Sequence, residues 1–199
     1  MEATHSGPRI VAITGSVRPG NYTSMALALA VDEIRKQNIA VEVVDPATLN
    51  LPPPGFEPND GTHRLREAVS PATGVLFATP EYHGSFSSIT KLVIENLGFP
   101  SVMAGKPVSL LGVAAGQIGA IKSLEALTGV CLHIGAIVLP GAVSVANVQK
   151  IFDAEGRCSD AKIEERIRWA GRNLMEYIRG AVCPRITLEA MVRGQGAKR

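Results

Sequence analysis

Short apolar runs recur five times along the chain, and helical patterns separate them. The runs cover residues 9–14, 41–44, 74–79, 107–114 and 135–139. Within most runs apolar residues follow one another without alternating with polar ones, which is typical of parallel strands buried on both faces. The pattern therefore predicts a five-stranded parallel sheet with helices on both faces, a three-layer α/β/α sandwich.

Apolar residues at helical spacing predict the helices between and after these runs. The predicted helices cover residues 23–36, 62–70, 87–97, 121–132 and 162–178. In the last of them, five apolar residues form one stripe: Ile163, Ile167, Ala170, Leu174 and Tyr177. The proline-rich segment 49–61 lies between two elements and is expected to be a surface loop.

The domain organisation follows from the same pattern. No internal repeat and no linker divides the chain, so residues 9–182 are expected to form one domain. Residues 1–8 are expected to be a disordered tail. Residues 183–199 are expected to be a C-terminal tail that is either disordered or part of an interface.

Composition excludes several classes of protein. Of the 199 residues, 46% are apolar and 19% are charged, which is enough apolar material for a full core. The net charge of +2 is too small to indicate a nucleic-acid partner. The three cysteines form no C-x-x-C motif, which argues against a disulfide framework, an iron–sulfur cluster or a zinc ribbon and favours the cytoplasm.

Neither a signal peptide nor a membrane span is expected. The N-terminal segment MEATHSGPR lacks the apolar stretch of a signal peptide. The longest apolar run, residues 108–115, has the length of a strand.

Ligands of an open parallel sheet bind beyond the carboxyl ends of its strands, which draws attention to three loops. The loop after the first strand, GSVRPGNYTS (15–24), is neither G-x-G-x-x-G nor G-x-x-x-x-G-K-[ST], because Asn21 stands where the lysine is needed. It also lacks the cysteine of a thiolate phosphatase. Hydroxyls, backbone N–H groups and one guanidinium before a helix suit a phosphomonoester. The alternative is an ordinary capped turn with Arg18 in solvent.

The loops after the third and fourth strands suit a flat polar ring. TPEYHGSFSSITK (79–91) puts Tyr82 and His83 beside Gly84, and AAGQIG (114–119) offers two glycines and bare backbone. Each loop alone is better explained by a tight glycine turn. The three loops together indicate one ligand with a phosphate and a flat ring.

The stretches GSVRPGNYTSMAL, ATPEYHGSFSSITKLVIENLG and GVAAGQIGA resemble the NAD(P)H-dependent FMN reductase family, over roughly residues 9–140. This group includes FMN, quinone, chromate and azo reductases. The resemblance implies a flavodoxin-like fold with strand order 2-1-3-4-5 and FMN at the switch point. It also implies NADPH or NADH as hydride donor and a small-molecule electron acceptor: flavin, quinone, azo compound or oxyanion.

By position, the resemblance implies which residues hold FMN. Its phosphate would be held by Ser16, Arg18, Tyr22, Thr23 and Ser24. The isoalloxazine and ribityl chain would be lined by Pro80, Glu81, Tyr82, His83, Gly84 and Ser85, with Gly116, Gln117 and Gly119 approaching from the fourth strand. The chain departs from many relatives at residues 19–22, where they are serine-rich, and at residues 86–88, where they carry a proline and a glycine.

No catalytic side chain is assigned, because the resemblance places the chemistry at the flavin N5 atom. Backbone N–H groups of residues 83–85 would stabilise the reduced ring. His83 is either a proton relay or a packing residue, and Glu81 is either a base or a hydrogen-bond partner of loop backbone. His63 and His133 have no partners at metal-ligand spacing, so no metal site is expected.

The helix expected at residues 87–97 is apolar on more than one side, and relatives of the family form oligomers, so a homodimer or homotetramer is expected. Two other functions stay open beside the reductase. A flavodoxin-type electron carrier is disfavoured by the isoelectric point near 8.5, because such carriers are usually acidic. A non-catalytic flavin- or phosphate-binding protein of the same fold is the second.

Overall fold

The computed structural model describes residues 7–196 and contains one sheet of seven strands. Five strands run parallel in the order β2 (Ala40–Val44), β1 (Arg9–Thr14), β3 (Gly74–Tyr82), β5 (Pro107–Val113) and β6 (Ile137–Val138). Because β5 and β6 are the predicted fourth and fifth strands, the predicted order 2-1-3-4-5 is confirmed. The switch point lies between β1 and β3, which pair with each other from Ile10–Gly74 to Thr14–Ala78.

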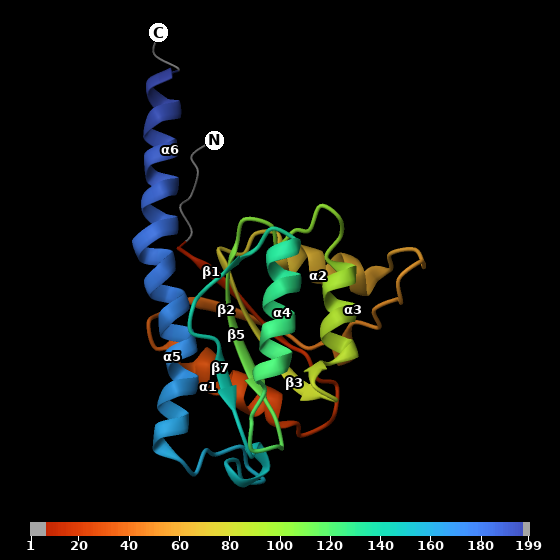
Figure 1. The fold of residues 1–199 in the computed structure, drawn as a ribbon. Helices are drawn as coiled ribbons and strands as arrows, with labels where there is room; N and C mark the ends of the chain where they lie inside the picture. Colours follow the sequence, from red (N-terminus) through yellow and green to blue (C-terminus); the bar gives the residue numbers. More distant parts are fainter. Residues whose placement is uncertain (1–6, 197–199) are drawn as a thin grey trace.

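Helices cover both faces of the sheet, as the three-layer prediction requires (Figure 1). One face carries α1 (Tyr22–Arg35) and α5 (Ala161–Tyr177), and the other carries α2 (Asp60–Val69), α3 (Ser88–Asn96) and α4 (Ile121–His133). In β1, Ile10 and Ala12 pack toward α1 and α5, whereas Val11 and Ile13 pack toward the other layer. Both sets are buried, which is why the strand is apolar throughout.

The fifth strand is divided, which corrects the single strand predicted at residues 135–139. It consists of β6 and β7 (Val143–Val145), which pair with the beginning and the end of β5. Between them Gly141 has φ of 86° and lies against the indole of Trp169 on α5. A side chain at position 141 would collide with that indole, so the break is fixed by packing between helix and strand.

The segment after Thr79 is a hairpin, where the sequence predicted an irregular loop at residues 80–85. Strand β3 continues to Tyr82 and pairs with β4 (Ser85–Phe86). The two residues between them, His83 and Gly84, have φ of 52° and 75°, as in the tight turns that suit hairpins. Pro80 is tolerated in β3 because β1 ends opposite Ala78, so its missing N–H faces no neighbouring strand.

Residues 183–196 form a helix, within the segment that the sequence predicted to be a C-terminal tail, either disordered or part of an interface. Residues Ile178–Val182 form a π-helix that continues α5 into α6 (Cys183–Gly196), which runs past the end of the sheet (Figure 1). Pro184 has no N–H and its ring crowds the preceding turn, and a π-turn relieves that conflict. Four apolar side chains of α6 are exposed: Ile186, Leu188, Met191 and Val192. Residues 1–6 of the predicted N-terminal tail lie outside the described range.

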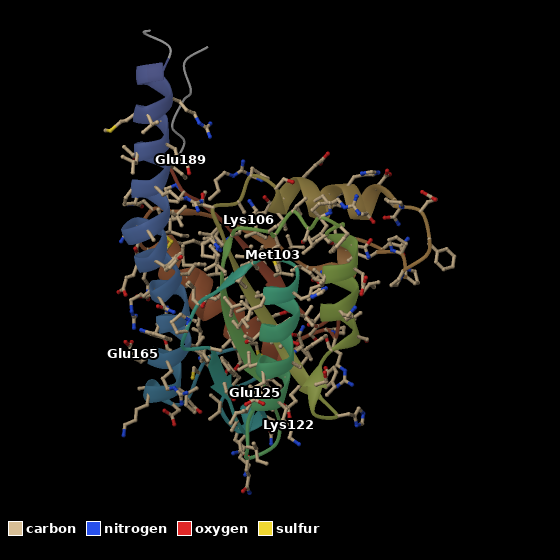
Figure 2. All side chains as sticks on the ribbon, turned by 45° about the horizontal axis from the view of Figure 1, so that its top comes forward. Met103, Lys106, Lys122, Glu125, Glu165 and Glu189 are labelled. Carbon is tan, nitrogen blue, oxygen red and sulfur yellow. The ribbon has the colours of Figure 1, made fainter. Side chains whose placement is uncertain are left out.

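Two 3₁₀ helices, η1 (Pro46–Thr48) and η2 (Val148–Lys150), complete the described elements. In Figure 2, Lys106 and Lys122 mark opposite ends of the sheet. Lys106 comes just before β5 begins, and Lys122 lies on α4, beyond the carboxyl end of β5. The loops singled out by the sequence gather at the Lys122 end. None of the helices in residues 7–196 is long and apolar enough to cross a membrane.

Candidate functional site

The loop between β1 and α1 is shaped by Asn21. Its side-chain oxygen accepts a hydrogen bond from Ser24 N at 2.8 Å, which makes it the N-cap of α1, and its amide nitrogen donates to Arg18 O at 2.7 Å. Gly20, with φ of 61°, turns the chain just before this cap. Asn21 therefore holds the loop in place, a structural role that its position in the sequence left undecided.

The backbone of this loop offers free donors. The N–H groups of Ser16, Val17 and Arg18, and those of Tyr22 and Thr23 in the first turn of α1, meet no acceptor within residues 7–196. Such groups at a helix N-terminus favour an anion.

Two buried residues with hydroxyl side chains line the same cavity. Ser16 and Thr23 are 4% and 2% exposed, and both line a cavity of about 380 Å³. Their hydroxyls form no hydrogen bond with any other described residue, although neither oxygen is sealed from the surface. Polar groups in such a position are satisfied by water or by a ligand.

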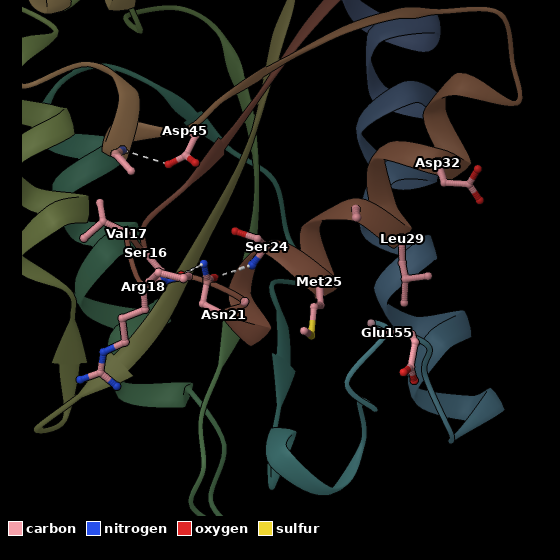
Figure 3. A pocket seen from close by; sticks show the side chains of 15 residues that line it. Ser16, Val17, Arg18, Asn21, Ser24, Met25, Leu29, Asp32, Asp45 and Glu155 are labelled. Atoms are coloured by element: carbon pink, nitrogen blue, oxygen red, sulfur yellow. Dashed lines mark hydrogen bonds between the residues drawn. The ribbon is translucent and has the colours of Figure 1, made fainter.

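Ser24 differs from these two residues. Its hydroxyl lies 3.2 Å from Thr14 Oγ1 and its N–H donates to Asn21. It lines a groove of about 680 Å³ along α1 instead of the cavity (Figure 3). The groove shares residues 16 and 18–21 with the cavity and continues past Asp32 and Glu155. Arg168 holds the pKa of Asp32 below its ordinary value through a hydrogen bond.

The hairpin forms the opposite wall of the cavity. Pro80, Glu81 and Tyr82 line it, and the guanidinium of Arg18 lies 5.0 Å from the centre of the Tyr82 ring. This cation–π contact joins the loop before α1 to the hairpin. The carboxylate of Glu81 accepts a hydrogen bond from Ser123 N at 3.1 Å, in the first turn of α4.

The end of β5 and the loop 114–120 supply the third wall, through Val113, Ala114 and Ala115. Gly119 is required for packing: its φ is 78°, and a side chain there would collide with Ser144 Oγ, which accepts from Ala120 N at 2.8 Å. Gly116 faces open space.

Seven of the fourteen residues inferred from the sequence line this one cavity: Ser16, Arg18, Tyr22, Thr23, Pro80, Glu81 and Tyr82. The other seven lie in the same loops but outside its lining: Ser24, His83, Gly84, Ser85, Gly116, Gln117 and Gly119. The sequence did not single out these lining residues: Pro19, Gly20, Asn21, Val113, Ala114, Ala115 and Val148. All but Val148 adjoin the inferred residues, so a wider window would have found them.

The cavity has donors at one end, and an aromatic ring with apolar side chains at the other. A group with a phosphate and a flat polar ring fits that arrangement. Within the described residues no three His, Cys, Asp or Glu side chains gather closely enough to hold a metal ion. Cys131 lies in the core, where burial raises the pKa of its thiol to about 12.

Comparison with known proteins identifies the family. The model of the NADPH-dependent FMN reductase family matches residues 8–150. The chain belongs to this family. FMN and a reduced nicotinamide nucleotide are therefore its cofactors, and it is an oxidoreductase. The resemblance inferred from the three loops is confirmed.

Individual relatives agree with this family of FMN reductases. An NAD(P)H-dependent FMN reductase of Pseudomonas aeruginosa is 32% identical over 180 residues, covering 86% of this chain and 95% of that protein. A quinone reductase of Pseudomonas putida is 27% identical over 164 residues, covering 76% and 84%. These relatives support the reductase and not the electron-carrier or non-catalytic alternative.

Solved structures confirm the fold of this FMN reductase family member. FerB, an NAD(P)H:acceptor oxidoreductase of Paracoccus denitrificans, superimposes with a TM-score of 0.71 at 20% identity, covering 87% of this chain and 98% of FerB. An archaeal flavodoxin gives 0.60 at 10% identity, covering 86% and 99%. The flavodoxin-like architecture is thus confirmed.

Proposed function

We propose that this enzyme holds FMN in the 380 Å³ cavity, with the phosphate at the loop before α1 and the isoalloxazine between the hairpin and Ala114–Ala115. One observation supports this most strongly: Ser16 and Thr23 are buried and line the cavity, and their hydroxyls form no hydrogen bond with another described residue. The N–H groups of Tyr22 and Thr23 add the positive end of α1. Arg18 contributes a full charge over Tyr82.

The chain's own residues bind and orient, and the flavin, when bound, carries electrons from the nicotinamide to the acceptor. Glu81 serves as a support, because its carboxylate already accepts the N–H of Ser123 and ties the hairpin to α4. Ser24 is a support as well, through Thr14 and Asn21. No side chain is proposed as a nucleophile or a base.

We further propose that backbone N–H groups of residues 83–85 face the polar edge of the isoalloxazine. Gly84→Val tests this, because a branched side chain disfavours φ of 75° while Lys122 Cδ, 3.5 Å from the added Cβ, leaves room for it. The strain of about 1–2 kcal/mol should weaken FMN binding about tenfold. Gly105→Val, with a similar φ of 73° and open space around it at the opposite end of the sheet, is the control. Unchanged affinity in Gly84→Val refutes the role.

The proposed acceptors are flavins and quinones, the substrates that the names of the two Pseudomonas relatives print. Steady-state oxidation of NADH and of NADPH should be measured with free FMN, a benzoquinone, an azo dye and chromate, together with flavin content of the purified protein. We expect bound or titratable FMN and turnover with quinone or flavin. A protein that takes up no FMN and oxidises neither nicotinamide contradicts the proposal.

We propose a homodimer or homotetramer built on the outer face of α3 and α4. A hollow of about 560 Å³ lies between these helices, and Phe99 at its rim is 91% exposed. Leu132 of α4 is 56% exposed. Light scattering should give two or four chains for the wild type and fewer for Phe99→Glu. A monomeric wild type refutes this.

A cytoplasmic location is proposed on the free state of Cys131, Cys158 and Cys183, which suits a reducing compartment. Cell fractionation tests it, and recovery of the enzyme outside the cytoplasm contradicts it.

A further inference from the structure

Three buried hydroxyls lie between the loop before α1 and the hairpin. They belong to Thr79, Ser87 and Thr90, which are 0%, 2% and 0% exposed. Ser87 Oγ lies 2.5 Å from Gly15 O, and Thr79 Oγ1 lies 3.0 Å from Pro80 O. Thr90 Oγ1 lies between them, 3.0 Å from Ser87 Oγ and 2.9 Å from Thr79 Oγ1. The chain of hydroxyls therefore joins the first residue of one site loop to the hairpin of the other.

The direction of these hydrogen bonds follows from counting protons. Each hydroxyl has one proton, and a carbonyl oxygen can only accept. The proton of Ser87 goes to Gly15 O and that of Thr79 goes to Pro80 O, so neither is left for Thr90. The single proton of the Thr90 hydroxyl then goes to Thr79 Oγ1, and Thr90 is tied to Ser87 through its backbone N–H. The backbone of Thr90 is thereby held in place, because Thr90 N donates to Ser87 Oγ at 3.0 Å. This hydrogen bond makes Ser87 the N-cap of α3.

This arrangement orients the backbone of the site. In a planar trans peptide the C=O and the following N–H point in opposite directions. Because Gly15 C=O points at Ser87, the N–H of Ser16 points away from it, and Ser16 lines the cavity. The peptide between Pro80 and Glu81 is held in the same way at the other end.

We propose that Thr90 is a positioning residue, which acts through Ser87 and Thr79 to fix the spacing between the phosphate loop and the hairpin. The inference rests on the proposed place of FMN in the cavity. A ligand that touches both loops depends on their spacing, whereas a ligand that touches only the hairpin does not. Thr90 therefore sets how strongly the site prefers FMN over riboflavin, the same ring without the phosphate.

The test compares Thr90→Ser with Thr90→Ala, which differ by one hydroxyl. Apoprotein is titrated with FMN and with riboflavin, and flavin fluorescence gives both dissociation constants. The ratio of FMN to riboflavin affinity should fall about three- to tenfold in Thr90→Ala, the worth of one buried hydrogen bond. It should stay near the wild-type value in Thr90→Ser.

Ser109→Ala is the matched control. Its hydroxyl is also buried, 3% exposed, and donates to Ala170 O at 3.0 Å between β5 and α5. It should lower the unfolding midpoint without changing the affinity ratio. The inference is overturned if Thr90→Ala weakens both flavins equally, leaves the ratio unchanged, or behaves like Thr90→Ser. A wild type that binds neither flavin overturns the proposed FMN site, and this inference with it; a wild type that prefers FMN leaves the variants to decide the inference alone.

Discussion

Gly15→Ala should damage both the fold and the FMN site, because nothing around Gly15 has room for a methyl group. An added Cβ would overlap Thr90 Oγ1 and would lie 2.9 Å from Ala78 O and 3.3 Å from Thr79 Cα. Two of these three neighbours are backbone of β3, in the middle of the sheet. The loop cannot retreat easily, since Gly15 N donates to Ala78 O at 2.7 Å.

The magnitude has two parts. Overpacking at a rigid position costs about 1–3 kcal/mol. Displacing the Thr90 hydroxyl weakens a buried hydrogen bond worth about 1 kcal/mol. The sum is roughly 3 kcal/mol, which for a chain of this size lowers the midpoint of thermal unfolding by about 6–12 °C.

Urea unfolding and thermal melting of three variants measure this. Gly116→Ala lies in the same site but in open space, so it should change the free energy of unfolding by less than about 0.5 kcal/mol. The double variant Gly15→Ala, Thr90→Ala removes the side-chain overlap and leaves the contact with Ala78 O, so it should recover only part of the loss. The reasoning is refuted if Gly15→Ala is as stable as Gly116→Ala.

Four further predictions concern other parts of the chain. The Cys131 thiol, whose pKa burial raises to about 12, should resist iodoacetamide until the protein unfolds, as mass spectrometry can measure; labelling of the native protein contradicts this. A hydrogen bond from Arg172 lowers the pKa of Glu33. The ion pair therefore stabilises the fold above about pH 4.5, and this stabilisation is lost as the pH falls through the lowered pKa. Arg172→Met should therefore cost about 1 kcal/mol in urea unfolding near neutral pH and little in strong acid, and equal losses would count against the pair. Glu81→Gln keeps an acceptor for α4 and should leave the pH profile of turnover unchanged, whereas a shifted profile would identify a base. Deleting residues 183–199 should leave FMN affinity unchanged, and a weakened affinity would show that α6 supports the site.

The sequence predicted the central strands well because their burial on both faces leaves an unmistakable apolar run. The observed β1 has the same ends as predicted, residues 9–14. The split fifth strand was missed because its cause, the indole of Trp169 against Gly141, comes from a helix almost thirty positions away. The hairpin at residues 82–85 was missed because a histidine rarely takes the positive φ that its turn requires.

The place of the site was predictable from the sequence. Which of its residues face a ligand, and which contact other parts of the chain, was not. Parallel strands bring the carboxyl ends of β1, β3 and β5 together, so the loops could be chosen from order alone. Whether a polar side chain in them faces a ligand or another part of the chain depends on tertiary contacts. Val148 lines the cavity because tertiary contacts bring its segment there, although that segment carries no motif.

Three helices begin at the site, and each has a side chain from a site loop bonded to its first turn. Asn21 bonds to α1, Ser87 to α3 and Glu81 to α4. These polar groups are used in building the fold, although by residue type they match a ligand site equally well. What is left for the ligand is backbone N–H, the guanidinium of Arg18, and the hydroxyls of Ser16 and Thr23, which form no hydrogen bond with another described residue. Substitutions of Asn21, Ser87 or Glu81 should therefore change both the stability of the fold and the affinity for FMN. Ser16→Ala and Thr23→Val should change the affinity for FMN alone.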